Sequence, residues 1–314
     1  MNSEEPGYIQ ALKKGLLQEK IRQAAEILQS CTLCPRKCRV NRQAGEKGIC
    51  RTLDQAVVYG YHAHFGEEAP LVGRFGSGTI FFTHCNLKCS FCQNFEISHK
   101  GDGKPVSDTE LADMMLELQK EGCHNINFVT PSHVVPQILS AVRIAAEKGL
   151  AIPLVYNSSA YDAVETLRIL DGIIDIYMLD FKFWDPRTSD VTCGAPDYPD
   201  VARKAIVEMH RQVGDLVIDA AVMDSSVMDS SGLAVKGLLI RHLVMPDGLA
   251  ETLEIMKFIA TKISVNTYVN VMPQYHPSGD TGSMKSLRRQ ITPAEYAKAL
   301  RYARDAGLTR IDKR

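Results

Sequence analysis

Apolar positions along the chain follow two different periods. From residue 7 to 29 they recur at helical spacing, which predicts an amphipathic helix. Residues 55–75 predict loops, with a hairpin as the alternative, and the duplicated unit VMDSSVMDSSG at 222–232 predicts a polar hairpin tip. From residue 78 onward, short apolar runs predict strands at 79–82, 125–129, 152–156, 174–181, 237–244 and 267–272, with helices from 107 to Gly122 and at 134–148, 161–169, 199–212 and 249–262.

Helix-start signals support this alternation. Ser107 and Glu110 have the spacing of a capping box, and Thr292 with Glu295 begins a last helix. Strand and helix alternate about six times, which is the pattern of parallel βα units. We therefore predict an α/β fold, a partial (β/α)6 barrel with its functional groups at the carboxyl ends of the strands. The expected division is a helical and cysteine-rich cap at 1–75, a core barrel at 76–285 and a C-terminal helix packing on it at 286–314.

Composition narrows the range of partners. The formal net charge of the 314 residues is −1, and 23% of them are charged, so no basic surface for nucleic acid or membrane is expected. The longest apolar runs have the length of strands and are too short to span a bilayer. The first residues lack the basic region and apolar core of a signal peptide, which favours a cytoplasmic protein.

The nine cysteines are clustered rather than spread along the chain. Cys123 and Cys193 stand alone, and we expect the first to be a core residue and the second to be incidental. A disulfide framework would be unusual in a chain of this size without an export signal. Clustered thiols in a reducing compartment more often bind metal or carry out redox chemistry. The two groups are Cys31, Cys34, Cys38 and Cys50, and Cys85, Cys89 and Cys92.

The second group lies in THCNLKCSFCQN, residues 83–94, directly after the first strand of the predicted barrel. A structural zinc site normally takes four protein ligands, and a ferredoxin cluster takes four cysteines. Three thiolates at Cys85, Cys89 and Cys92 would leave one iron of a cluster open to another cofactor. The alternatives are three incidental buried thiols, or zinc with His84 as the fourth ligand.

At this loop the chain resembles the radical S-adenosylmethionine (SAM) superfamily. The order of CTLCPRKCRVNRQAGEKGIC and CNLKCSFCQN resembles the PflX-like branch, which is related to the pyruvate formate-lyase activating enzyme. The resemblance implies a barrel of the radical SAM type, with a [4Fe–4S] cluster on Cys85, Cys89 and Cys92 whose fourth iron binds SAM. It also implies reductive cleavage of SAM to a 5′-deoxyadenosyl radical that abstracts a hydrogen atom from substrate. The protein would orient this chemistry and exclude water.

The same resemblance implies cofactor contacts at three strand ends. Phe91 would pack near adenine, with core packing as the equal alternative. The TPSH segment at 130–133 replaces the Gly-Gly-Glu motif usual in activating enzymes, and there Thr130, Ser132 and backbone carbonyls would accept hydrogen bonds from the SAM amino group. Asn157 and Ser158 would meet the ribose hydroxyls, although both residue types are also common in turns.

Three further strand ends carry charged or titratable candidates. Asp180 and Lys182 alternate onto one face of their strand and resemble the Asp-x-Lys of activating enzymes, which implies a place near the SAM methionyl group; a structural ion pair is the alternative. Arg241 suits the SAM carboxylate because its guanidinium can bind in a fork. His242 points the opposite way and is expected to be structural. His276, after the last strand, would lie near the methionyl end, or at the surface.

The first cysteine group has the number of ligands of a complete metal site. The gaps between Cys31, Cys34, Cys38 and Cys50 suit either structural zinc or a second iron–sulfur cluster, and the basic residues Arg36, Lys37 and Arg39 would offset thiolate charge. An auxiliary cluster would suggest an electron relay, whereas zinc would suggest a folded cap. The absence of any metal is the third alternative.

Three functions are consistent with these residues. The first is activation of a glycyl radical enzyme, the second is radical SAM chemistry on a small molecule or another protein target, and the third is a non-catalytic iron–sulfur or zinc protein. An open iron argues against the third, because an electron carrier gains nothing from it. The resemblance implies a reductant such as flavodoxin or ferredoxin, and a glycyl radical enzyme or other protein as the expected partner.

Overall fold

The computed structural model describes residues 5–219, 232–279 and 284–312. Six parallel strands form its core, and they occur where the apolar runs predict them. Their order across the sheet is β9-β8-β6-β5-β4-β2. The α/β class and the partial six-stranded barrel are thereby confirmed. The strands are β2 (Ser77–Phe82), β4 (Ile126–Val129), β5 (Leu154–Ser158), β6 (Ile176–Asp180), β8 (Leu233–Leu243) and β9 (Tyr268–Met272).

Additional strands extend the sheet at both edges, and it stays partly open. β1 (Ala56–His64) pairs antiparallel with β2, and β3 (Lys104–Val106) pairs with the first residues of β1. β10 (Arg310–Ile311) lies parallel to β9 at the other edge. β7 (Val217–Asp219) pairs antiparallel with β8, so these two strands flank the duplicated unit, which lies almost entirely outside the described residues.

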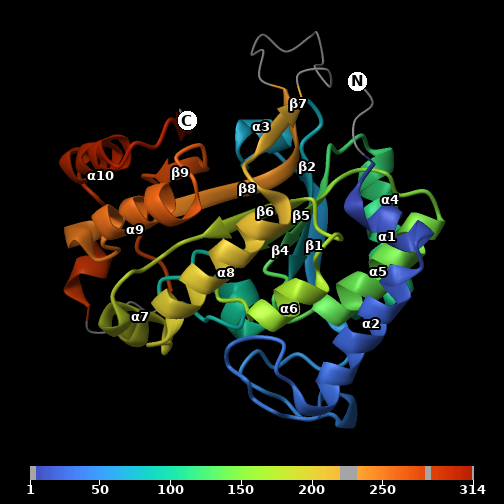
Figure 1. Cartoon of the computed structure of the whole chain (residues 1–314). Helices are drawn as coiled ribbons and strands as arrows, with labels where there is room; N and C mark the ends of the chain where they lie inside the picture. The colour runs from blue at the N-terminus through green and yellow to red at the C-terminus, as the bar shows by residue number, and fades with distance from the viewer. Residues whose placement is uncertain (1–4, 220–231, 280–283, 313–314) are drawn as a thin grey trace.

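Helices connect the parallel strands and cover their outer face (Figure 1). Both capping boxes are present, at Ser107 with Glu110 and at Thr292 with Glu295. α7 (Pro186–Cys193) was not expected, because its sequence has too few apolar residues for a helical period. The others are α4 (Asp108–Lys120), α5 (Val135–Glu147), α6 (Val164–Ile169), α8 (Tyr198–Val213), α9 (Thr252–Phe258) and α10 (Pro293–Asp305).

The N-terminal helix is divided in two. α1 (Gly7–Lys13) and α2 (Leu16–Glu26) meet at Gly15, whose φ of 70° is left-handed and ends the first helix. The single helix predicted over 7–29 was therefore wrong at this point. Tyr8 anchors α1, because its buried ring places the hydroxyl 3.1 Å from the Ile152 carbonyl oxygen.

The cysteine-rich segment follows α2 and lies beside α6 at the lower end of the view in Figure 1. The Thr166 hydroxyl of α6 donates to the Leu33 carbonyl at 2.8 Å, which ties this segment to the barrel. A short helix, α3 (Ala69–Val72), connects β1 to β2, where loops or a hairpin were expected. The division at residues 75 and 285 stays a prediction. No helix in the described ranges is long and apolar enough to cross a membrane.

Candidate active site

A cavity of about 350 Å³ opens at the carboxyl ends of the parallel strands. It extends from His64 at the end of β1 to Met272 at the end of β9. The fold therefore gathers at one place residues that lie more than 200 positions apart in the sequence. The predicted site residues that line the cavity are Cys85, Cys89, Phe91, Cys92, Thr130, Asn157, Ser158, Asp180, Lys182 and Arg241.

The three cysteines lie in the loop that leaves β2. His84 and Lys88 adopt left-handed backbone conformations, with φ of 69° and 56°, and so turn the loop around the sulfur atoms. The Leu87 amide donates to Cys85 Sγ at 3.4 Å, and the Ser98 hydroxyl donates to Cys92 Sγ at 3.2 Å. Donors of this kind stabilise sulfur that carries negative charge, so this set of thiols suits iron–sulfur coordination.

Cys193 at the end of α7 was expected to be incidental, and that expectation was wrong. Its buried thiol lies beside the thiol of Cys89 and helps to raise the pKa of that group. Burial raises the pKa of the Cys85 thiol to about 12 and also raises that of Cys92. Cluster binding must therefore release protons from this loop, because thiolates are the ligands.

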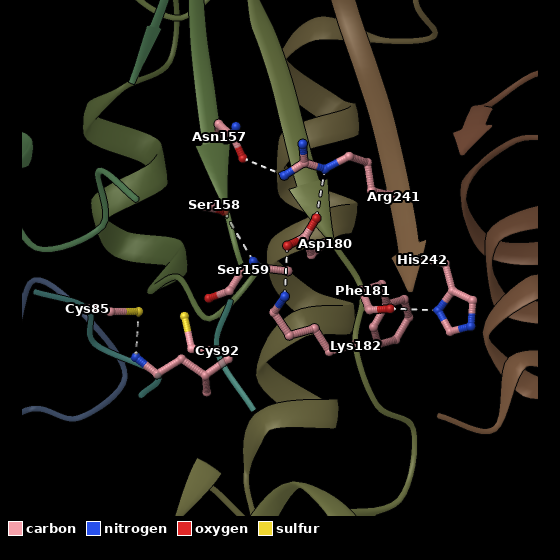
Figure 2. Close-up of polar contacts among 12 residues, drawn as sticks. Cys85, Cys92, Asn157, Ser158, Ser159, Asp180, Phe181, Lys182, Arg241 and His242 are labelled. Carbon is pink, nitrogen blue, oxygen red and sulfur yellow. Dashed lines mark hydrogen bonds and ion pairs between the residues drawn. The ribbon is translucent and has the colours of Figure 1, made fainter. Parts of the chain in front are cut away.

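Asp180 and Lys182 lie together, as the alternation along their strand predicts. Lys182 Nζ is 2.7 Å from Asp180 Oδ2, and Arg241 Nε is 2.8 Å from Asp180 Oδ1 (Figure 2). Burial alone would raise the pKa of Asp180, but the two cations lower it to about 2. The carboxylate is therefore ionised at any physiological pH, and Lys182 carries its positive charge toward Cys89 and Cys92.

Arg241 holds three other elements together. Its Nη1 lies 3.0 Å from Glu67 Oε2, and its Nη2 lies 2.9 Å from Asn157 Oδ1. With the bond to Asp180, three nitrogens of the guanidinium each donate to a protein acceptor. This arrangement fixes the ends of β5, β6 and β8 relative to the loop before α3. The proposed contact of Arg241 with the SAM carboxylate stays a prediction.

Glu67 lines the cavity and was not identified from the sequence. Its Oε1 accepts from Asn127 Nδ2 at 3.0 Å, and the neighbouring Glu68 accepts from Asn270 Nδ2 at 2.7 Å. Both glutamates are buried. No local signal identified them, because adjacent acids are ordinarily exposed to solvent and the burial of these two depends on strands that come much later in the chain.

Ser158 and its neighbour Ser159 both line the cavity but differ in their hydrogen bonds, and the proposed contact of Ser158 with the ribose stays a prediction. The Ser158 hydroxyl donates to Asp162 Oδ2 at 2.6 Å. It also accepts from the Ala160 amide at 3.1 Å, which is the contact drawn from Ser158 in Figure 2, so it is already bonded. Ser159 also lines the cavity and is only 7% exposed. Its Oγ has no hydrogen-bond partner within the described ranges of the chain. An orphaned buried hydroxyl at a cavity wall is suited to bind a polar ligand group.

The TPSH segment contributes to the site mainly through Thr130, which lines the cavity. His133 points away from it, with Nε2 2.9 Å from the Thr83 carbonyl oxygen. Burial lowers the pKa of His133 to about 3, so its imidazole is neutral. Arg42 Nη1 donates to the His133 carbonyl at 2.8 Å, which joins this loop to the N-terminal segment.

The remaining candidates divide between core and surface. Phe91 is buried against Phe183, with ring centroids 5.7 Å apart, and also lines the cavity, so it packs in the core, and its contact with adenine stays a prediction. His242 is structural, as predicted, because its ring bridges the Phe181 carbonyl and the Thr252 hydroxyl. His276 is exposed and bonded to Gln290 at 2.7 Å; it does not line the cavity, whereas Gln274 of the same segment does.

Comparisons with known proteins agree with this geometry. A profile of the Radical SAM superfamily matches residues 79–224. A Methanocaldococcus jannaschii protein, described as uncharacterized protein MJ0674, is 31% identical over 311 residues, covering 96% of this chain and 82% of that protein.

Two solved structures show weaker likeness. The cobalamin-dependent S-adenosylmethionine radical enzyme OxsB is 13% identical with a TM-score of 0.41, over 73% of this chain and 31% of that one. HydG, a maturase of the [FeFe]-hydrogenase, is 15% identical with a TM-score of 0.47, over 94% of this chain and 55% of that one. The chain thus spans less than two thirds of either enzyme.

The profile covers the loop after β2 that carries Cys85, Cys89 and Cys92, and the Methanocaldococcus jannaschii relative aligns along nearly the whole chain. The protein belongs to the radical SAM superfamily.

Proposed function

We propose that this radical SAM enzyme removes a hydrogen atom from an extended segment of a protein substrate, as an activating enzyme does at a glycine of a glycyl radical enzyme. The observation that supports a peptide substrate is the open edge of β1. β3 pairs only with residues 56–58 of β1. In the described parts of the chain, no strand pairs with the outer edge of residues 59–64, so an extended peptide could add to the sheet there.

This open edge leads to the cavity. His62 and His64 lie on one face of β1, with the His62 ring stacked on Phe81 at a centroid distance of 5.3 Å. His64 and Phe81 both line the cavity, and His62 is exposed beside them. A peptide paired with the open edge of β1 would therefore lie next to the mouth of the cavity.

When bound, the [4Fe–4S] cluster and SAM supply a one-electron reductive cleavage that generates the hydrogen-abstracting radical. The chain's own residues hold and shield that chemistry. Cys85, Cys89 and Cys92 provide the thiolate ligands, and Lys182 places a positive charge beside them. The Ser159 hydroxyl is available to a polar group of SAM. Burial of these groups excludes water from the site.

The first experiment measures 5′-deoxyadenosine. The protein is reconstituted anaerobically with iron and sulfide, reduced with dithionite and given SAM. Wild type is expected to form the product and Cys89→Ala to lose it, whereas Cys123→Ala should behave as wild type because that cysteine is buried far along the sheet from the cavity lining. Equal product from Cys89→Ala would contradict the assignment of the loop.

The peptide proposal has a separate test. Extended glycine-centred peptides carrying deuterium on Cα should transfer deuterium to 5′-deoxyadenosine, detected by mass spectrometry. His62→Ala should weaken this transfer and leave peptide-free cleavage of SAM unchanged. Tyr61→Phe is the matched control, because Tyr61 faces the other side of β1 and bonds to Glu117. Transfer from small metabolites but from no peptide would favour the small-molecule alternative.

A further inference from the structure

The N-terminal cysteine group lies outside the cavity lining and is a site in its own right. We propose that Cys31, Cys34, Cys38 and Cys50 bind a second iron–sulfur cluster, docked directly against the loop that holds Cys85, Cys89 and Cys92. This proposal does not depend on the identity of the substrate.

Backbone contacts bring the four cysteines together. The Cys31 amide donates to the Val40 carbonyl at 2.9 Å, and the Arg39 amide donates back to the Cys31 carbonyl at 2.9 Å, so Cys31 lies beside the turn that carries Cys38. Gly48, two residues before Cys50, lies against Cys38. The thiol of Cys34 is close enough to the other three to interact with each of them electrostatically.

Three of these sulfurs already accept hydrogen bonds from nitrogen. The Ile49 amide donates to Cys38 Sγ at 3.5 Å, and the Arg36 amide donates to Cys34. Arg42, which is almost completely buried, places Nη1 4.0 Å from Cys31 Sγ. N–H donors and a buried cation both stabilise thiolates, which these cysteines become when they bind metal.

The Cys38 sulfur lies so close to Gly48 that it leaves no room for a side chain at position 48. A Cβ at this position would lie 2.8 Å from Cys38 Sγ and 2.9 Å from Cys38 Cβ, closer than such atoms approach one another. Gly48 does not have a left-handed backbone, so the close approach of Cys38 is what excludes a larger residue here.

The two cysteine groups share one feature. Four sulfurs bound to one zinc ion lie at about 2.3 Å from it, and hence about 3.8 Å from one another. Within residues 5–219, 232–279 and 284–312, no three Cys, His, Asp or Glu side chains converge closely enough to hold a single ion. The same is true of Cys85, Cys89 and Cys92, the cluster loop of the superfamily. Because the N-terminal group shares this feature with the catalytic loop and lies directly against that loop, we favour a cluster over zinc at this site.

Arg36, between Cys34 and Cys38, fastens this group to the catalytic loop. Its Nε donates to the Asn86 carbonyl at 3.0 Å and its Nη2 to the Leu87 carbonyl at 3.1 Å. The same guanidinium also donates to the carbonyls of Cys193, at 2.8 Å, and Gly194. One arginine side chain therefore joins the N-terminal group, the residues between Cys85 and Cys89, and the partner of Cys89 on α7.

This position suits an electron relay. The side of the N-terminal group near Ile49, which is 44% exposed, reaches the protein surface, and the opposite side meets the catalytic loop through Arg36. A one-electron carrier protein would deliver one electron to the N-terminal cluster, which would pass one electron to the barrel cluster and return to its starting state.

The test counts metal in a chain that lacks the barrel ligands. Cys85, Cys89 and Cys92 are all replaced by Ala, and the variant is reconstituted anaerobically with ferrous iron and sulfide. About four irons per chain and an electron paramagnetic resonance signal after reduction are expected. One zinc per chain, or no iron, would overturn the proposal. If this variant does not fold, the wild-type count decides between about eight irons, as expected, and about four, which would refute it.

A milder variant locates the cluster. Gly48→Ala should lower the iron content of the N-terminal site, because the new methyl group would occupy the space of Cys38 Sγ. Gly60→Ala is the matched control, since a Cβ there meets no atom within 4 Å. Unchanged iron in Gly48→Ala would place the cluster elsewhere. Because iron is counted without SAM or substrate, failure here is distinct from failure to form 5′-deoxyadenosine.

Discussion

Arg241 Nε lies 2.8 Å from Asp180 Oδ1, although 61 positions separate the two residues in the sequence. They are register partners on the parallel strands β6 and β8, and Lys182 occupies the other oxygen of the same carboxylate. All three side chains are largely buried. A buried carboxylate between two cations is stable only while every partner is present, which makes this group a structural support of the cavity wall.

Asp180→Asn should therefore destabilise the protein strongly. The change leaves Lys182 buried without its counter-charge and leaves Arg241 with Glu67 alone, and removal of one partner of a buried pair costs about 3–5 kcal/mol of unfolding free energy. Urea unfolding measures the difference. Asp113→Asn is the control, because its ion pair with Lys148 is solvent-exposed and should contribute less than about 1 kcal/mol. Equal small losses would show that the buried pair is not essential to stability.

The same carboxylate predicts a pH dependence. Its pKa is about 2 in the folded protein and 3.8 ordinarily, so the folded state favours the ionised form. The stability that Asp180 contributes is fully present above 3.8 and is lost as the pH falls through about 2. The difference in urea stability between wild type and Asp180→Asn should therefore narrow from pH 5 to pH 2. A constant difference over that range would exclude Asp180 as its source.

Ser159 and Ser158 should respond differently to replacement by alanine. Ser159→Ala removes an unpartnered hydroxyl from the cavity wall and should raise the Kd for SAM about 2- to 10-fold, with little change in stability. Ser158→Ala removes a partner from buried Asp162 and should cost about 1–3 kcal/mol of stability. Calorimetric titration and urea unfolding separate the two effects. If Ser158→Ala alone weakened SAM binding, the result would support the sequence-based assignment of Ser158 and contradict the role proposed for Ser159.

Loss of a ligand from the N-terminal cluster should slow the reaction when a carrier protein supplies the electrons, but not when dithionite does. With Cys50→Ser, formation of 5′-deoxyadenosine driven by reduced flavodoxin or ferredoxin should fall, whereas formation driven by dithionite should persist, because a small reductant can enter the cavity directly. Cys123→Ser should change neither rate, since that cysteine lies outside both groups. Equal losses with both reductants would mean that the N-terminal group supports the fold but carries no electrons.

Local periodicity was sufficient to predict most of the secondary structure. Each parallel strand and most helices lie where apolar spacing and capping residues place them, because these signals come from neighbours within four or five positions. The helix break at Gly15 and the short α7 were missed since their local signals are weak. The spacing of Cys85, Cys89 and Cys92 likewise indicated their chemistry without any tertiary information.

Contacts between strands that are far apart in the sequence could not be predicted from local periodicity. The sequence by itself determined the βα alternation, the cysteine groups and the pairing of Asp180 with Lys182 two positions later. Only the tertiary structure decided that Glu67 joins Arg241, that Ser159 rather than Ser158 has a free hydroxyl, that His276 lies outside the cavity lining, and that Arg36 binds the catalytic loop. The physical reason is that these outcomes depend on strand order and register, which are set by packing over the whole sheet.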